Sequence, residues 1–99
     1  MRVALLNAPS AKTYGSLGFA AGRYFPLGLG YIAAVLMQKG HEVLFLDPEA
    51  QNLDARSIHS SLASFKPLLT GISCSTPSFP AASSLASMAR QAYPETAII

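Results

Sequence analysis

The sequence predicts an α/β domain with a doubly wound parallel sheet. Three observations predict it: short continuous apolar runs, segments of helical period between them, and proline, glycine or asparagine at the junctions. Continuous apolar runs are typical of parallel strands that are buried on both faces. Because strands that alternate with helices form right-handed crossovers, the helices are expected to cover both faces of the sheet.

The expected strands are residues 3–6, 42–47, 68–73 and 96–99. Asn7 and Pro9 close the first, and the second stops at Pro48, which cannot donate to a strand ladder. The last run reaches Ile99 without a turn or a polar cap. A sheet clipped there would leave an apolar edge that intact domains usually cover. We therefore expect one domain over residues 1–99, truncated after the fourth strand, in a longer polypeptide.

Helices are expected between these strands. The first begins at Pro26, whose ring pre-sets φ, and ends before Gly40, a favourable left-handed cap. The second is expected to be capped by Asn52 and to stop before Pro67, and the third to open at Pro80. The residues expected to point inward are Leu29, Ile32, Ala33 and Leu36, then Ala55, Ile58, Leu62 and Phe65, then Ala82, Leu85, Ala89 and Ala92.

Composition excludes several classes of protein. Of the 99 residues, 51% are hydrophobic and only 12% charged, against an average of about 25%, so disorder driven by charge is excluded. The net charge of +2 is spread along the chain, and without a basic stripe nucleic acid is not an expected partner. Neither a secretory pattern nor a membrane-spanning run is found. A single cysteine fits a reducing compartment, so we expect a cytoplasmic location.

The chain carries no catalytic constellation that its sequence reveals. Cys74 has no neighbouring histidine or cation, and we expect a small buried thiol rather than a nucleophile. His41 is expected to be structural and His59 to be a solvated helix residue. Since the acidic residues are scattered, paired carboxylates are not expected either. We predict neither catalytic nor metal-ligating residues in these 99 residues.

A ligand is expected where the strand order reverses, beyond the carboxyl ends of the strands. In a flavodoxin-like order this point lies between the first and third strands. Asn7 and Pro9, with the long loop up to residue 25, would meet the turn that contains Ser73, Ser75 and Thr76. Hydroxyls and a helix N-terminus donate hydrogen bonds without adding charge, which suits a large, neutral, polar ligand. Capping of the third helix is an equally common use of such hydroxyls.

A nucleotide- or flavin-binding domain is the alternative. Gly28, Gly30 and Ala33 match the pattern G-x-G-x-x-A, and Asp47 ends the next strand, where a ribose-binding acid would lie. That pattern requires its first glycine directly after the first strand, whereas residues 8–27 intervene here. A receiver-type interaction domain is a further hypothesis, but no acidic cluster follows the first strand.

Residues 26–36 (PLGLGYIAAVL), 40–43 (GHEV) and 71–80 (GISCSTPSFP) are similar to a known family. In this combination the chain resembles the N-terminal cobalamin-binding domain of cobalamin-dependent radical S-adenosylmethionine (radical SAM) enzymes, over essentially its whole length. The resemblance implies a flavodoxin-like domain that holds the corrin over the carboxyl ends of its strands. It also implies that the nucleotide tail of the cofactor inserts toward the sheet.

The resemblance further implies particular residues. Ser73 and Thr76 match a serine and a threonine that line the tail pocket in the broader cobalamin-binding fold. The D-x-H-x-x-G motif of many such domains is missing, because no histidine occurs between Asn7 and Gly40. This is common in the radical branch, where the lower face of cobalt lacks a histidine ligand and the loop of residues 8–25 would approach it. The candidate cofactor-binding residues are Asn7, Pro9, Gly28, Ser73, Ser75, Thr76 and Phe79.

The remaining implications concern the parent protein. The C-x-x-x-C-x-x-C segment that holds the 4Fe-4S cluster of a radical SAM domain does not occur in residues 1–99. The resemblance therefore implies a partner domain in the same polypeptide, with that cluster and S-adenosylmethionine as its cofactors. The implied reaction is methyl transfer to a substrate carbon, although some relatives close rings instead. For the fragment itself, the bare fourth strand also suggests an edge-paired dimer.

Overall fold

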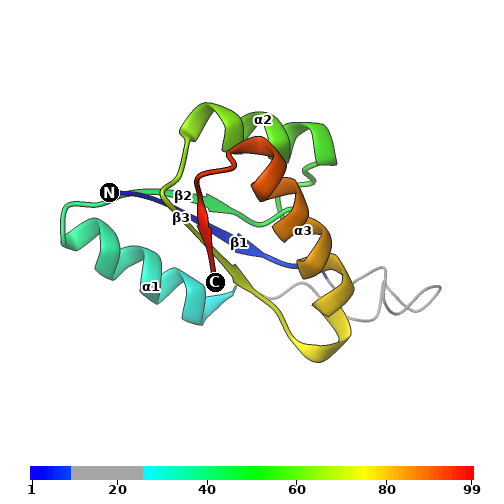
Figure 1. Cartoon of the computed structure of the whole chain (residues 1–99). Coiled ribbons are helices and arrows are strands. Elements are labelled where there is room, and N and C mark those ends of the chain that lie inside the picture. Colours follow the sequence, from blue (N-terminus) through cyan, green and yellow to red (C-terminus); the bar gives the residue numbers. More distant parts are fainter. Residues whose placement is uncertain (10–25) are drawn as a thin grey trace.

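The computed structural model describes residues 1–9 and 26–99 (Figure 1). Its elements are β1 (Arg2–Asn7), α1 (Leu27–Gln38), β2 (Glu42–Leu46), α2 (Ala55–Phe65), β3 (Leu69–Ser73), the 3-10 turn η2 (Thr76–Ser78), α3 (Phe79–Ala92) and β4 (Ala97–Ile98). All strand pairs are parallel, in the order β2-β1-β3-β4. The predicted doubly wound, flavodoxin-like α/β fold is confirmed, with the strand order reversing between β1 and β3.

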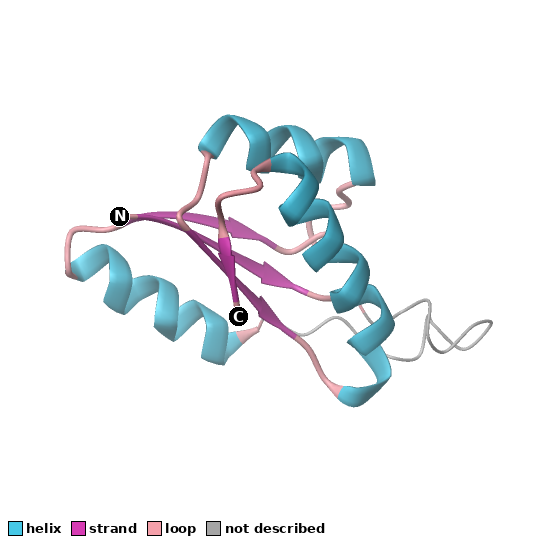
Figure 2. Ribbon diagram, viewed as in Figure 1, coloured by secondary structure: helices cyan, strands magenta, loops and turns pink. Residues whose placement is uncertain are grey.

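Alternation along β1 divides the core into two layers. Val3 and Leu5 pack with Leu29 and Ala33 of α1. The other core cluster joins the opposite face of β1 to α2 and α3, through Ala4, Leu6, Ile58, Leu62, Ala82, Leu85 and Ala89. In the described residues, α1 covers one face of the sheet and α2 and α3 cover the other (Figure 2). The sequence predicts a fully buried β2, and this is wrong. β2 is only partly buried because it is an edge strand.

The start of α2 differs from the prediction. Asp54, not Asn52, is the N-cap, and its side-chain Oδ1 accepts a hydrogen bond from the Ser57 N–H at 2.8 Å. Asn52 lies in the preceding turn with a φ of 52°. Both residue types cap helices well and both tolerate turn conformations. The local sequence therefore contained two competing caps two residues apart, and the chain geometry selected the second.

The other helices also depart from the expected pattern in detail. α3 begins at Phe79 because η2 runs directly into it, so Pro80 lies inside the first turn. Ile32 was expected to point inward but is 51% exposed. Ala55, at the first position of α2, is exposed too. In α1 no charged residue marks an outward side, so the periodicity of apolar residues could not orient this helix.

β4 is short but firmly attached to β3. The ladder continues past it, because the Ile99 N–H donates to the Thr70 carbonyl and the Ile72 N–H to the Ile99 carbonyl, both at 3.0 Å. The buried hydroxyls of Thr70 and Thr96 share a hydrogen bond of 2.8 Å. Arg90 Nη1 donates to the carbonyls of Pro94 and Thr96. None of the helices in the described residues is long and apolar enough to span a membrane.

Candidate functional site

The candidate site is built where β1 and β3 end together. Asn7 and Ser73 are register partners, and the Ala8 N–H donates to the Ser73 carbonyl at 2.9 Å. This register brings the two predicted segments to one edge of the sheet, with Pro9 partly buried next to them. We refer to residues 7–9, 47 and 73–79 as the carboxyl rim. The long loop expected to complete it lies outside the described residues, except for Ala8 and Pro9.

The serines of the turn after β3 are divided between two uses. Ser78 is buried, and its hydroxyl accepts from the Ser75 N–H at 2.9 Å and donates to the Ser75 carbonyl at 3.2 Å. The Ser75 hydroxyl lies 3.3 Å from that of Ser78. This network holds the chain as it enters α3, so the helix-entry role that the sequence allowed is correct for Ser75 and Ser78.

Ser73 and Thr76 differ from these two serines. Within residues 1–9 and 26–99, no hydrogen bond joins their hydroxyls to another residue. Thr76 is exposed and Ser73 is half-buried. From residue 73 to 78, Ser73 and Thr76 are therefore the two whose hydroxyls bond to no other described residue, and they are also the two for which the resemblance implies a place in the tail pocket.

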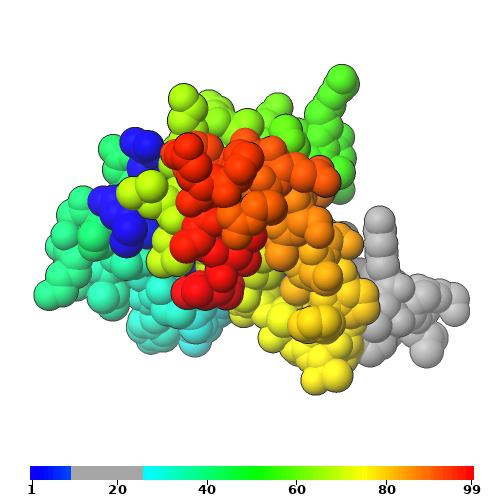
Figure 3. Space-filling model, viewed as in Figure 1, coloured from blue at the N-terminus to red at the C-terminus, as the bar shows by residue number. Residues whose placement is uncertain are grey.

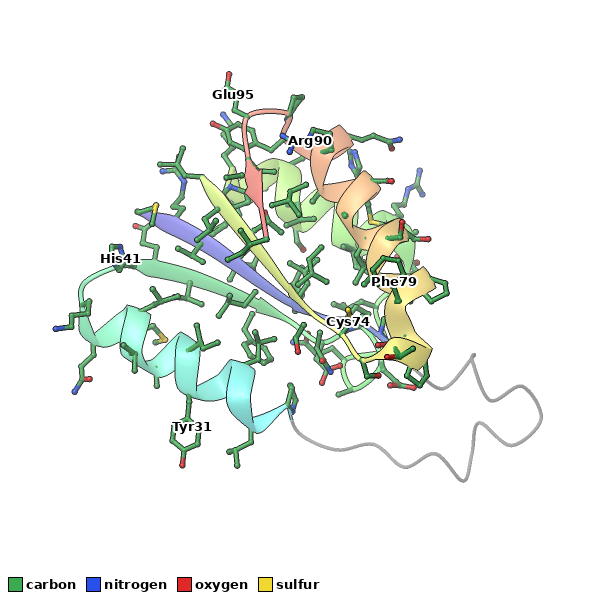
Figure 4. All side chains as sticks on the ribbon, turned by 60° about the horizontal axis from the view of Figure 1, so that its bottom comes forward. Tyr31, His41, Cys74, Phe79, Arg90 and Glu95 are labelled. Carbon is green, nitrogen blue, oxygen red and sulfur yellow. The ribbon has the colours of Figure 1, made fainter. Side chains whose placement is uncertain are left out.

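Two further side chains at the rim are exposed (Figure 4). Phe79, the first residue of α3, is 63% exposed and offers an aromatic face at the same end of the sheet. Cys74 was expected to be a buried thiol but is exposed, because the chain leaves the sheet after Ser73. The sequence placed Cys74 in the turn at this rim but predicted its burial wrongly. Its place directly after the last residue of β3 was the signal that could have revealed the exposure of the thiol.

Gly28 leaves space beside the first turn of α1. Apart from its chain neighbours and the backbone of its own helix, no atom of the described residues lies within 4 Å of a Cβ atom built at this position. α1 runs antiparallel to the strands, since its C-terminal end leads into β2 through Gly40 and His41. Its N-terminal turn therefore lies on the carboxyl side of the sheet, where a ligand could approach the backbone of Gly28.

The residues of the nucleotide alternative are arranged differently from a nucleotide site. Gly28 and Gly30 lie inside α1 rather than in a tight turn after β1, and the Gly30 N–H donates to the Pro26 carbonyl in the helix. Asp47 is buried in its own turn, where Oδ1 lies 3.4 Å from the Ala50 N–H. Its backbone N–H donates to Gln51 Oε1 at 2.7 Å. The nucleotide alternative is therefore not favoured.

Both histidines lie away from the rim. His41 is at the opposite, amino edge of the sheet, with Nδ1 3.2 Å from the N-terminal amine (Figure 4). His59 is exposed on α2, as predicted. Among the described residues, no group of three His, Cys, Asp or Glu side chains could hold a metal ion.

The pKa shifts also lie elsewhere. The Ser57 N–H lowers the pKa of Asp54, and a hydrogen bond to Glu95 raises the pKa of Tyr93. Neither group belongs to the rim. Asp47 is the only carboxylate there, and it is buried in its turn, so the side chains that the described rim exposes are neutral.

Ligands of open α/β sheets bind where the strand order reverses, and here that point exposes neutral groups that can form hydrogen bonds. The fold and the rim define a cofactor-binding domain of the flavodoxin-like class. The model of the B12 binding domain family matches residues 17–99, and the chain belongs to that family. Membership supports cobalamin as the ligand. Neither a curated protein nor a solved structure matches the chain.

Proposed function

We propose that this domain binds cobalamin non-covalently over the ends of β1 and β3, as the N-terminal module of a radical SAM enzyme that transfers a methyl group to a substrate carbon. One observation carries the binding proposal: in a chain of the B12-binding family, the available hydroxyls of Ser73 and Thr76 lie at the strand-order reversal. The wider enzyme is supported by the resemblance of residues 26–36, 40–43 and 71–80 to that enzyme class.

The chemistry of the rim fits a corrin with amide side chains and a nucleotide tail. The hydroxyls of Ser73 and Thr76 and the amide of Asn7 can exchange hydrogen bonds with neutral amides. Phe79 presents a flat apolar surface to a planar group, and Gly28 leaves room for close approach. Pro9 and Ser75 complete the proposed contacts, Ser75 through the hydroxyl that also holds the turn.

The proposed site places no histidine beneath cobalt. His41 lies at the opposite edge of the sheet, His59 is exposed on α2, and the sequence has no histidine between Asn7 and Gly40. When bound, cobalamin supplies the methyl-transfer chemistry at its metal centre. The residues of this chain hold and orient the cofactor.

Hydroxocobalamin tests the binding proposal directly. The chain is incubated with it and passed through a gel-filtration column, and the visible spectrum of the protein peak is recorded. We expect retained corrin. Thr76→Val and Ser73→Ala should each weaken binding by about three- to tenfold, since a net hydrogen bond contributes roughly 0.5–1.5 kcal/mol. Ser87→Ala, on the exposed side of α3, is the matched control and should bind like the wild type.

The same experiment tests whether a histidine of this chain is a ligand of the cobalt. His41→Ala and His59→Ala should leave the spectrum of the bound corrin unchanged, and a shift in either variant would contradict a site without histidine. No corrin in the protein peak, combined with heat stabilisation by NAD or FMN, would favour the nucleotide alternative instead.

The parent enzyme is tested by sequence. Cys74 alone cannot hold an iron-sulfur cluster, so the proposal assigns the 4Fe-4S cluster and S-adenosylmethionine to a partner domain beyond Ile99. A C-x-x-x-C-x-x-C segment in the downstream coding sequence would support this assignment. A stop codon or an unrelated domain there would contradict it and leave the binding proposal intact.

A further inference from the structure

Asp47 is a buried carboxylate at the carboxyl rim that the proposed function does not use. It directly follows β2 and is 6% exposed. Its backbone is bonded twice to Gln51: the Asp47 N–H donates to Gln51 Oε1 at 2.7 Å, and the Asp47 carbonyl accepts from the Gln51 N–H at 2.9 Å. From the described residues its carboxylate accepts a single hydrogen bond, from the Ala50 N–H, at the long distance of 3.4 Å. The turn is therefore closed by the two bonds to Gln51 and depends little on the carboxylate.

The carboxylate of Asp47 has more acceptor capacity than the described fold uses. Its two oxygens offer about four acceptor sites, and buried polar groups in proteins are as a rule hydrogen-bonded. A buried acceptor whose sites are left empty costs free energy. A donor from a bound ligand would satisfy this carboxylate, provided that the ligand reaches its level in the sheet.

The strand register places Asp47 level with two of the proposed cofactor contacts. Leu46 pairs with Leu6, so Asp47 lies at the level of Asn7, and Asn7 pairs with Ser73. We call Asp47, Asn7 and Ser73 the polar row. It crosses the ends of β2, β1 and β3, which are neighbours in the sheet. Because neighbouring strands lie only about 4.8 Å apart, a large ligand over the ends of β1 and β3 is also next to the end of β2.

Alternation puts the polar row on one side of the sheet. Leu5, Phe45 and Leu69 pack in the layer that α1 covers, and each stands an even number of residues before a member of the row. Since successive side chains along a strand point to opposite faces, the row faces the α1 side as well. Gly28, in the first turn of α1, contributes no side chain on this side. The three polar groups therefore share one face at the end of the sheet where α1 begins.

Burial increases along the polar row from β3 to β2. Ser73 leads into the turn of residues 74–77, which is exposed and forms a corner of the molecular surface (yellow in Figure 3). Ser73 and Asn7 are half-buried, and Asp47 is buried. The row thus runs from a surface where a ligand can enter to an acceptor that lacks donors.

We propose that the Asp47 carboxylate accepts a hydrogen bond from a hydroxyl or amide donor of the bound corrinoid, and so makes the site specific for ligands with a donor at this depth. This inference rests on the proposed function. A carboxylate accepts and does not donate, and its hydrogen bonds are stronger than those between neutral groups. Cobalamin carries such donors in two places, the ribose hydroxyls of its nucleotide tail and the primary amides around its ring.

Asp47→Asn tests the proposal with two corrinoids. The variant keeps the shape of the side chain and one acceptor oxygen for the Ala50 N–H. Hydroxocobalamin and cobinamide, which lacks the nucleotide tail, are each titrated against the chain, and binding is followed in the visible spectrum. Asp47→Asn should raise the dissociation constant for cobalamin about tenfold. The proposal is supported whether or not cobinamide is affected: an equal rise identifies a ring amide as the donor, and an unchanged affinity identifies the tail.

Two control variants separate this contact from a role in the turn. Gln51→Ala removes the 2.7 Å bond to the Asp47 N–H but leaves the carboxylate in place. It should lower Tm and change the dissociation constant for cobalamin less than about twofold. Asp54→Asn alters an exposed carboxylate outside the rim and should bind both corrinoids like the wild type. Circular dichroism verifies that each variant is folded. If Asp47→Asn does not fold, Asp47→Ser, whose hydroxyl suits the same kind of turn, replaces it and should show the same loss.

Two results overturn the inference alone. The first is a folded Asp47→Asn chain that binds cobalamin as tightly as the wild type. The second is a Gln51→Ala chain that loses as much affinity as Asp47→Asn, which would mean that Asp47 acts only through the turn. Both results require a wild-type chain that binds cobalamin. A wild-type chain that binds neither corrinoid overturns the proposed function and this inference with it, so the two failures are distinguishable.

Discussion

The two faces of the sheet are covered by helices that pack in the same way but direct different side chains outward. On one face, α2 and α3 bury Ile58, Leu62, Leu85 and their neighbours, and direct serine, arginine and histidine outward. On the other, α1 buries Leu29 and Ala33 and directs large apolar side chains outward. Helix-on-sheet packing accounts for both inner layers. In the described residues, what differs is therefore the outer side of the helices.

Matched leucine substitutions give the largest expected effect. Leu62 of α2 is fully buried in the layer that α2 and α3 form on the sheet, whereas Leu29 belongs to α1, the only described helix on the other face. Leu62→Ala should cost about 4 kcal/mol of unfolding free energy and Leu29→Ala about 2 kcal/mol, because a less enclosed site loses fewer contacts and collapses more easily. Urea denaturation of both variants measures the difference. Equal losses would mean that the α1 layer is as enclosed as the other.

The buried threonine pair sharpens the comparison on the α2–α3 face. Thr70→Val removes one partner of the 2.8 Å hydroxyl bond and leaves the buried Thr96 hydroxyl unpaired, so it should cost about 2 kcal/mol. The double variant Thr70→Val with Thr96→Val removes both groups and should recover most of that loss. If the double variant instead loses as much unfolding free energy as the two single variants together, the two hydroxyls do not act as a unit.

Two glycine substitutions test the packing on the α1 side of the sheet, one at a crowded position and one at an open position. Gly71→Ala places a Cβ 3.1 Å from Leu5 and should cost about 1 kcal/mol through overpacking. Gly28→Ala meets open space in a helix and should stabilise the chain by about 0.5 kcal/mol. Thermal melts give the signs. If Gly28→Ala stabilises the chain and also weakens cobalamin retention, the glycine is kept for the ligand rather than for the fold.

The smallest effect concerns the cap of α2 and depends on pH. The Ser57 N–H lowers the pKa of Asp54 below its ordinary value of 3.8. The cap therefore stabilises the fold above that pH, and the contribution is lost as pH falls through the lowered pKa. Asp54→Ala should reduce Tm slightly at neutral pH and match the wild type in strong acid. Asp54→Asn keeps a capping oxygen that does not titrate, and a pH-dependent Tm difference between it and Asp54→Ala would contradict this account.

The candidate site was predictable in outline and not in detail. Handedness and strand order place the ends of β1 and β3 together, so the order of the predicted elements was enough to pair Asn7 with Ser73. Which hydroxyls stay available could not be predicted, because Ser75 and Thr76 are equally polar in sequence. Both are exposed, but the turn geometry brings the Ser75 hydroxyl to 3.3 Å from that of Ser78, whereas the Thr76 hydroxyl bonds to no other described residue.

Sequence by itself determined the kind and order of the elements, because the apolar period of 2 or 3.6 residues and the turn residues act over a few neighbours. Tertiary structure decided the burial of positions whose local pattern was ambiguous. Cys74 is exposed because the sheet ends before it, Ile32 because α1 rotates Leu29 and Ala33 toward β1, and Asp54 caps α2 in place of Asn52. In each case the outcome depends on how segments that are distant in the sequence pack together, and a short stretch of sequence does not contain that information.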